Sequence, residues 1–206
     1  MALQDIPHKI SYRNIKYPRI EFTSGKLHYI LPPNYRQEEI FCKHKKWIQK
    51  KWQFIERCLK ASEKKELIER SDDEFRGLVL SLIVKISEEM NVRVNQVYFK
   101  LLKTKWASLS SKKNIMVNKL ARALPQQLIE YIVFHEIAHL KQKRHNERFW
   151  TIMEHRFRNY QELEKDLAIY WFRLASDTNA TNGIAQSLRA TAGSEAILRM
   201  DIDKKG

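Results

Sequence analysis

The chain has 206 residues, of which 43% are hydrophobic and 30% are charged, and its 38 Lys and Arg against 24 Asp and Glu give a formal net charge of +14. This length fits about one domain with an appendage, and the five Gly and five Pro are too few for collagen-like, Gly-Ser-linker or proline-rich chains. The apolar content argues against a wholly disordered chain, and the positive charge fits either a nucleic-acid-binding surface or a lysine-rich surface that maintains solubility.

The N-terminal part, within residues 10–32, has the pattern of β-strands. Segments 19–22 and 26–30 alternate in hydropathy, and a Ser-Gly pair between them predicts a tight turn. Pro18 predicts that the first segment is an edge strand or begins there. We therefore expect residues 1–36 to form an N-terminal β-hairpin region.

Helical periodicity follows the hairpin. Residues 37–60 and 73–90 each place apolar side chains at helical spacing, and Asp72 is the expected N-cap of the second helix. The charged stretch 62–73 predicts a break between the two helices.

Two features bear on the cellular compartment. Cys42 and Cys58 lie sixteen residues apart in one expected helix, more than about 20 Å at 1.5 Å per residue, which excludes a disulfide between them. Residues 1–17 show no apolar signal segment, and the longest apolar stretch, at 78–84, is too short to cross a bilayer. These observations predict a reducing, cytoplasmic location without membrane contact.

The middle of the chain returns to strands before further helices. Segments 97–102, 104–109 and 114–118 are strand-like, and a polar turn at 110–113 separates the last two. Pro125 is suited to the first position of a helix. We expect helices at 125–142, 147–157 and 160–175.

The last residues differ in composition from the rest. Residues 178–206 contain no aromatic residue and predict a loosely attached tail with one short helix near Ala196. The expected organisation is therefore a core of residues 37–176, with the hairpin region in the same domain and a tail at 177–206.

The chemistry is concentrated in residues 135–139, which read H-E-x-x-H. On a helix, four residues advance about 400°, so His135 and His139 lie on one face and can bind one tetrahedral ion. Glu136 projects about 100° away and is placed to hydrogen-bond a metal-bound water. The alternative is a pair of core histidines beside a salt-bridged glutamate.

A third metal ligand is expected after this helix. His145 is our first choice, provided that the helix ends near Gln142 and the chain turns back, with Asn146 as the N-cap of the next helix. The alternative is that His145 is an exposed loop residue and that a later carboxylate is the ligand. The carboxylates considered are Glu154, Glu162 and Glu164.

Three protein ligands leave a fourth position for water, which is typical of a catalytic zinc (Zn2+) site. Zinc lowers the pKa of its water towards about 7 and polarises a carbonyl. Glu136 takes the proton as the water attacks and passes it to the departing amine. The motif therefore predicts a zinc-dependent metallo-endopeptidase.

At these residues the chain resembles the YgjP-like metallopeptidases, zincin-type proteins related to the SprT-like group. The resemblance extends over roughly residues 10–172, and its strongest part is the H-E-x-x-H motif followed by His145 and the Phe149-Trp150 pair, which we expect to be core anchors. The run Trp106-Ala107-Ser108-Leu109 also matches, although the family has Gly and Cys where this chain has Ala107 and Leu109. Other matching positions lie in the segment 110–125, at Pro32 and at 46–48.

The resemblance implies an α+β fold, a zincin-like metallopeptidase domain. In it a small mixed or antiparallel sheet packs on helices, one of which carries the H-E-x-x-H motif. It also implies His135, His139 and His145 as zinc ligands and Glu136 as the catalytic acid/base.

In zincins, a strand beside the active-site helix pairs with an extended protein or peptide substrate. By resemblance we assign this role to Asn114, Ile115, Met116 and Val117, with Trp106 also at the substrate; the alternative is an ordinary internal strand. By side-chain type alone, the candidates for stabilising an oxyanion are Trp106, His28, Tyr131 and Arg156.

A different class of function starts from the lysines. Lysines 43, 46, 50 and 51 lie near Trp47 and Trp52, and others surround Trp106, which suits nucleic-acid binding. The protein would then be a non-catalytic binding module stabilised by zinc, or a DNA-linked protease of the SprT-like type. The alternative is that these lysines are solvated faces backed by core tryptophans.

Overall fold

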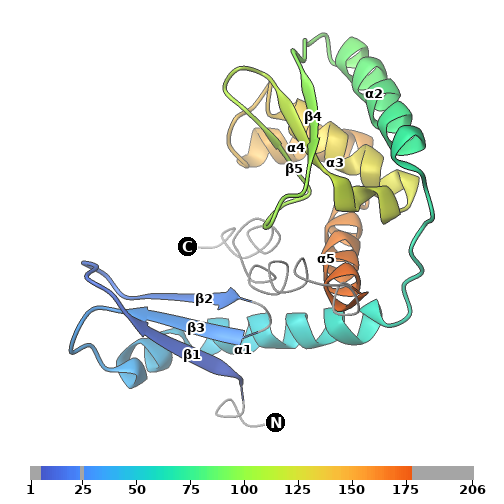
Figure 1. Ribbon diagram of the computed structural model, residues 1–206. Helices are drawn as coiled ribbons and strands as arrows, with labels where there is room; N and C mark the ends of the chain where they lie inside the picture. The colour runs from blue at the N-terminus through green and yellow to red at the C-terminus, as the bar shows by residue number, and fades with distance from the viewer. Residues whose placement is uncertain (1–5, 24–25, 178–206) are drawn as a thin grey trace. The chain divides into compact units, whose positions relative to one another are not determined.

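The computed structural model describes residues 6–23 and 26–177 (Figure 1). The described residues divide into two compact units, unit 1 with residues 6–23, 26–65 and 168–177 and unit 2 with residues 66–167. This division differs from the expected one, because the first helix belongs to unit 1 rather than to the unit that carries the H-E-x-x-H motif. The expected tail and its helix near Ala196 lie outside the described residues.

Unit 1 contains a small sheet and a long helix. Its elements are β1 (His8–Tyr12), β2 (Arg19–Thr23), β3 (Lys26–Leu31), α1 (Gln37–Ser62) and the second part of α5 (Tyr160–Asp177). The sheet order is β1-β3-β2, so the predicted antiparallel hairpin of β2 with β3 and the edge position of β2 are both confirmed. The parallel pairing of β1 with β3 was not predicted.

Aromatic packing joins α1 to the sheet of unit 1. The ring of Phe22 on β2 lies 5.9 Å from Trp47 and 6.3 Å from Trp52, measured between ring centroids. The buried stripe of α1 includes Ile40, Ile48 and Ile55, which follow helical spacing. The tryptophans of α1 therefore serve the packing of this unit.

Unit 2 contains the second sheet and the helices around it. Its elements are α2 (Asp72–Glu89), β4 (Val97–Lys100), β5 (Ala107–Leu109), β6 (Ile115–Asn118), the 3-10 helix η2 (Lys119–Ala123), α3 (Gln126–Ala138), α4 (Glu147–Arg156) and the first part of α5. The sheet order is β4-β6-β5, with β4 parallel and β5 antiparallel to β6. Helix α3 contacts α2, β5 and α4. The expected α+β class with small mixed sheets is confirmed, and among the described residues no helix is both long and apolar enough to span a bilayer.

The position of β6 corrects the predicted substrate strand. β6 pairs with β4 along one side and with β5 along the other, so its main-chain groups are already used within the sheet. The predicted pairing of an extended substrate with Asn114, Ile115, Met116 and Val117 is therefore wrong. β5 is an edge of the described sheet and the strand that contacts α3.

Two helix boundaries differ slightly from the predictions. Helix α3 ends at Ala138, with His139 as its C-cap, rather than near Gln142. The N–H groups of Leu140 and Lys141 bond three residues back, to Ile137 and Ala138, so the last turn tightens and the helix stops. At the start of α2 the N-cap is Ser71 and not Asp72.

Ser71 begins α2 with a capping box. Its hydroxyl accepts a hydrogen bond from the N–H of Glu74 (3.2 Å), and the Glu74 carboxylate accepts one from the N–H of Ser71 (2.8 Å). Two helix-end groups that would otherwise lack partners are satisfied in this way.

We predict that Ser71→Ala lowers the free energy of unfolding by about 1 kcal/mol, because the Glu74 N–H loses its acceptor. Urea denaturation followed by circular dichroism measures the change. Ser81→Ala, at an exposed position inside the same helix, is the control and should change stability by less than about 0.5 kcal/mol. Equal effects of the two substitutions would contradict the capping role.

Candidate metal centre

Helix α3 carries polar groups on a helix that is buried nearly all round. Every residue from 131 to 138 is buried, including His135 with 8% of its surface exposed and Glu136 with 9%. Burying a polar group without a hydrogen-bond partner costs free energy, about 1–3 kcal/mol according to protein mutational data. The partners of these two side chains therefore define the site.

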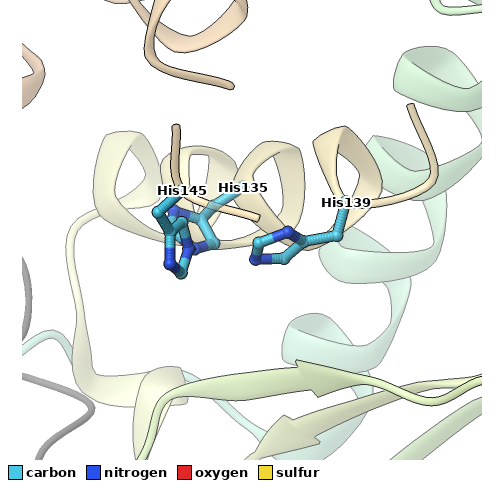
Figure 2. A group of neighbouring side chains, drawn as sticks. All are labelled: His135, His139 and His145. Atoms are coloured by element: carbon cyan, nitrogen blue, oxygen red, sulfur yellow. The ribbon is translucent and has the colours of Figure 1, made fainter. Parts of the chain in front are cut away.

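Three histidine rings converge on one side of α3, towards its C-terminal end (Figure 2). Ring centroids lie 5.0 Å apart for His135 and His139, 5.0 Å for His135 and His145, and 4.6 Å for His139 and His145. One nitrogen from each ring lies within 4.8 Å of the others, and the two Nε2 atoms of His135 and His145 are 3.0 Å apart. The predicted return of the chain towards the helix is confirmed, and the exposure of the rings increases from His135 through His139 to His145.

Phe149 and Trp150 on α4 hold these rings in place. The fully buried Phe149 ring lies 5.0 Å from His135, 4.7 Å from His139 and 4.7 Å from His145, measured between centroids. Trp150 stacks on His145 at 5.8 Å and donates its Nε1–H to the His145 carbonyl at 3.2 Å. Asn146 accepts a hydrogen bond from the N–H of Phe149, so the predicted N-cap is also confirmed. The two aromatic residues are the core anchors expected from the sequence.

The protonation of the rings fits metal binding. His139 Nδ1 lies 3.2 Å from the Gln142 carbonyl, so this nitrogen carries the proton and Nε2 keeps its lone pair. Burial lowers the pKa of both His135 and His139, and the neighbouring histidines lower that of His135 further. Neutral imidazole is the form that binds a metal ion.

The donor set also fits a particular class of ion. Nδ1 of the buried His135 has no hydrogen-bond partner among the described residues, so the polar contacts of this ring are made through Nε2. Ligand nitrogens of a tetrahedral zinc site lie about 3.3 Å apart, close to the 3.0 Å between His135 Nε2 and His145 Nε2. Three imidazoles without a carboxylate suit zinc or a neighbouring transition metal rather than calcium or magnesium.

The carboxylates considered as alternative third ligands lie elsewhere. Glu164 accepts a hydrogen bond from the buried hydroxyl of Tyr131 at 2.8 Å, while Glu154 and Glu162 are exposed. Among the described residues, the group whose donor atoms converge consists of the three histidines. The geometry therefore favours His145 over these carboxylates.

Glu136 is held between helix and sheet. Burial raises the pKa of its carboxyl group to about 7, against the opposing effects of a hydrogen bond from the Leu109 main chain and of the nearby Lys105 charge. The Leu109 N–H thus links the edge strand β5 to the glutamate of α3. In the sequence, Leu109 stands out only as a departure from the pattern of the resembled family, because a main-chain donor leaves no signal in the residue type.

The candidates for an oxyanion stabiliser have other partners where their contacts are described. The Tyr131 hydroxyl bonds Glu164, and Arg156 bonds Glu89 and, at 2.7 Å, Glu130. His28 belongs to unit 1, and its Nε2 lies 2.9 Å from the hydroxyl of Ser11. Trp106 is 6% exposed, and its predicted contact with substrate stays a prediction.

Comparisons with known proteins agree with this site. A family model described as "YgjP-like, metallopeptidase domain" matches residues 60–170, which include all three histidines and Glu136. A curated protein, the UTP pyrophosphatase of Escherichia coli (strain K12), is 35% identical over 71 residues. That match covers 34% of this chain and 42% of the relative, so the chain spans less than half the length of that protein.

Two solved structures of metallopeptidase zymogens also match part of the chain. Abylysin of Pyrococcus abyssi is 25% identical with a TM-score of 0.41, and the match covers 43% of this chain and 90% of that one. Jannalysin of Methanocaldococcus jannaschii is 27% identical with a TM-score of 0.39, and the match covers 44% of this chain and 92% of that one.

We predict that the protein binds one zinc ion per chain and that His145→Ala weakens this binding at least about 100-fold, because a nitrogen donor is lost. Competition with a zinc-binding dye measures the affinity, and the tetrahedral absorption bands of bound cobalt report the donor set. The control is His155→Ala, at an exposed histidine of α4 outside the cluster, which should bind zinc like the parent. Unchanged affinity in His145→Ala would contradict the assignment of this third ligand.

Proposed function

Because the chain belongs to the YgjP-like metallopeptidase family, we propose that it is a zinc-dependent endopeptidase with Glu136 as its general acid/base. Metallopeptidases are metal-dependent hydrolases, and the cluster of three histidines could hold such a metal ion. The observation that carries the proposal is the convergence of His135, His139 and His145 beside a buried glutamate of the same helix. The exposure of His145 leaves the cluster open to solvent on one side.

Each side chain has a distinct part in this proposal. The three imidazoles hold the ion, and zinc, when bound, supplies a Lewis acid that activates water and polarises a carbonyl. Glu136 keeps one carboxylate oxygen on the Leu109 N–H, and the second oxygen can take a proton from water and return it to the departing amine. The Leu109 contact fixes the carboxylate, so little motion is needed for this transfer.

The edge of β5 is the natural path for an extended peptide. The N–H of Asn118 bonds the carbonyl of Trp106, and the N–H of Ser110 bonds the carbonyl of Asn114, so alternate residues of this strand face β6. Since only every second residue of a strand bonds to a given neighbour, the main-chain groups of Leu109 point away from β6. This agrees with the hydrogen bond from the Leu109 main chain to Glu136. A peptide at this edge would lie next to the glutamate and would pair with main-chain groups of β5 other than the Leu109 N–H, which Glu136 occupies.

We predict that Glu136→Gln keeps zinc but lowers peptide hydrolysis by about 10²- to 10⁴-fold, because an amide cannot accept the proton. The glutamine oxygen can still accept the Leu109 hydrogen bond, so the fold should be preserved. Cleavage of a quenched fluorescent peptide library and zinc content measure the two properties. Glu154→Gln, at an exposed position of α4, is the matched control, and equal activity of the two variants would contradict the role of Glu136.

A second candidate is hydrolysis of the phosphoanhydride bond of a nucleoside triphosphate. It is favoured by the name of the Escherichia coli relative and by the Lys105 charge close to Glu136. A lysine there can pair with a phosphate.

The two candidates are separated by offering both substrates to the same zinc-loaded protein. We expect peptide cleavage and, at equal substrate concentration, at least about 10-fold slower release of pyrophosphate from UTP, a difference of about 1.4 kcal/mol in barrier. Mass spectrometry of peptides and a pyrophosphate assay give the two rates. Glu136-dependent pyrophosphate release without peptide cleavage would assign the site to the second candidate.

A further inference from the structure

The positive charge of the chain is concentrated in the part that does not carry the histidine cluster. By sequence, residues 6–65, which span the N-terminal part of unit 1, contain 15 Lys and Arg against 5 Asp and Glu, a net charge of +10. Residues 66–167, which form unit 2, contain 18 against 14, a net charge of +4. Solubility alone does not require the charge to be concentrated in one unit, because charged residues anywhere on the surface keep a protein soluble.

Within unit 1 the charge is densest on α1. Residues 40–55 contain five lysines and no carboxylate. Lys43, Lys46, Lys50 and Arg57 are all exposed and, at 100° per residue, lie within about 60° of one another around the helix. These four residues, the basic stripe, extend over about 21 Å at 1.5 Å per residue.

The lysines of the basic stripe lack acidic partners. No ion pair joins Lys43, Lys46 or Lys50 to a carboxylate among the described residues. In unit 2, by contrast, Arg122 pairs with Asp72 at 2.7 Å and Arg156 with Glu130 at 2.7 Å. Lys43, Lys46 and Lys50, which are exposed, can therefore reach an external anion.

From these observations we infer that the basic stripe binds the phosphate backbone of duplex nucleic acid. Duplex DNA presents one negative charge per about 1.7 Å of its axis, so a 21 Å row of cations can neutralise several phosphates at once. The inference is independent of the proposed hydrolase, since it concerns residues outside the histidine cluster.

The packing of the aromatic residues favours duplex over single-stranded nucleic acid as the ligand. Binding of single strands rests on aromatic rings that are free to stack on bases. Trp47 and Trp52 instead pack on Phe22 within unit 1, and Trp106 is buried in unit 2. The recognition must then come from backbone charge rather than from base stacking.

The same packing argues against a membrane surface. A helix that lies in a bilayer interface exposes an apolar face beside its basic one. The apolar stripe of α1, with Ile40, Ile48 and Ile55, is buried rather than exposed.

The test measures binding of the full chain to a fluorescent DNA duplex of about 20 base pairs by anisotropy. With three to four phosphates neutralised, affinity should fall about 40- to 150-fold between 50 and 200 mM salt. Lys43→Gln/Lys46→Gln/Lys50→Gln should weaken binding at 50 mM salt at least about 10-fold and reduce the salt slope by about 3. The same three positions changed to Arg should retain the parent affinity.

A matched triple variant controls for net charge. Lys85→Gln/Lys100→Gln/Lys112→Gln removes three exposed lysines of unit 2 and should bind DNA within about twofold of the parent. All variants should keep the parent melting temperature, zinc content and peptide or UTP hydrolysis, so a failure here is distinguishable from failure of the proposed function.

Four outcomes would overturn the inference. They are absence of duplex binding at 50 mM salt, equal losses in the two glutamine variants, equal competition by polyglutamate at the same charge concentration, and tighter binding of a single strand than of the duplex.

Discussion

The arrangement of unit 2 depends on the burial of polar groups in α3. This helix is apolar on nearly every face, yet it buries the His135 ring and the Glu136 carboxylate, and the half-buried His139 is its C-cap. Polar groups removed from water need compensating contacts. The rings of His145 and Phe149 contact His135, and the Gln142 carbonyl accepts a hydrogen bond from Nδ1 of His139. Strand β5 supplies a main-chain hydrogen-bond donor to Glu136. These contacts form because α3 ends at Ala138, the following loop turns back towards the helix, and α4 packs against it.

Much of this could be predicted from the sequence, because it rests on side-chain identity and short spacing. His135 and His139 are separated by one helical turn, Asn146 is a residue type that caps helices, and the alternation of β2 and β3 defines a hairpin. The family resemblance, confirmed by the match over residues 60–170, placed His145 in the same group.

What could not be predicted depends on contacts between distant segments. The parallel pairing of β1 with β3 and the central position of β6 are choices of strand order, and hydropathy alternation is the same for an edge and a central strand. For this reason the sequence could not decide between a substrate-pairing strand and an ordinary internal strand at residues 114–117. Likewise, the periodicity of α1 fits packing against any apolar surface, so it could not show that this helix belongs with the N-terminal sheet rather than with the histidine-bearing unit.

The hydrogen bond from Leu109 has a consequence for how this protein can change during evolution. Its donor is a main-chain N–H, which every amino acid except proline possesses. Any substitution at position 109 except proline therefore keeps the group that holds the glutamate. The residue at this position is thus constrained by the packing around its side chain, while the support of the carboxylate depends on the path of the β5 main chain.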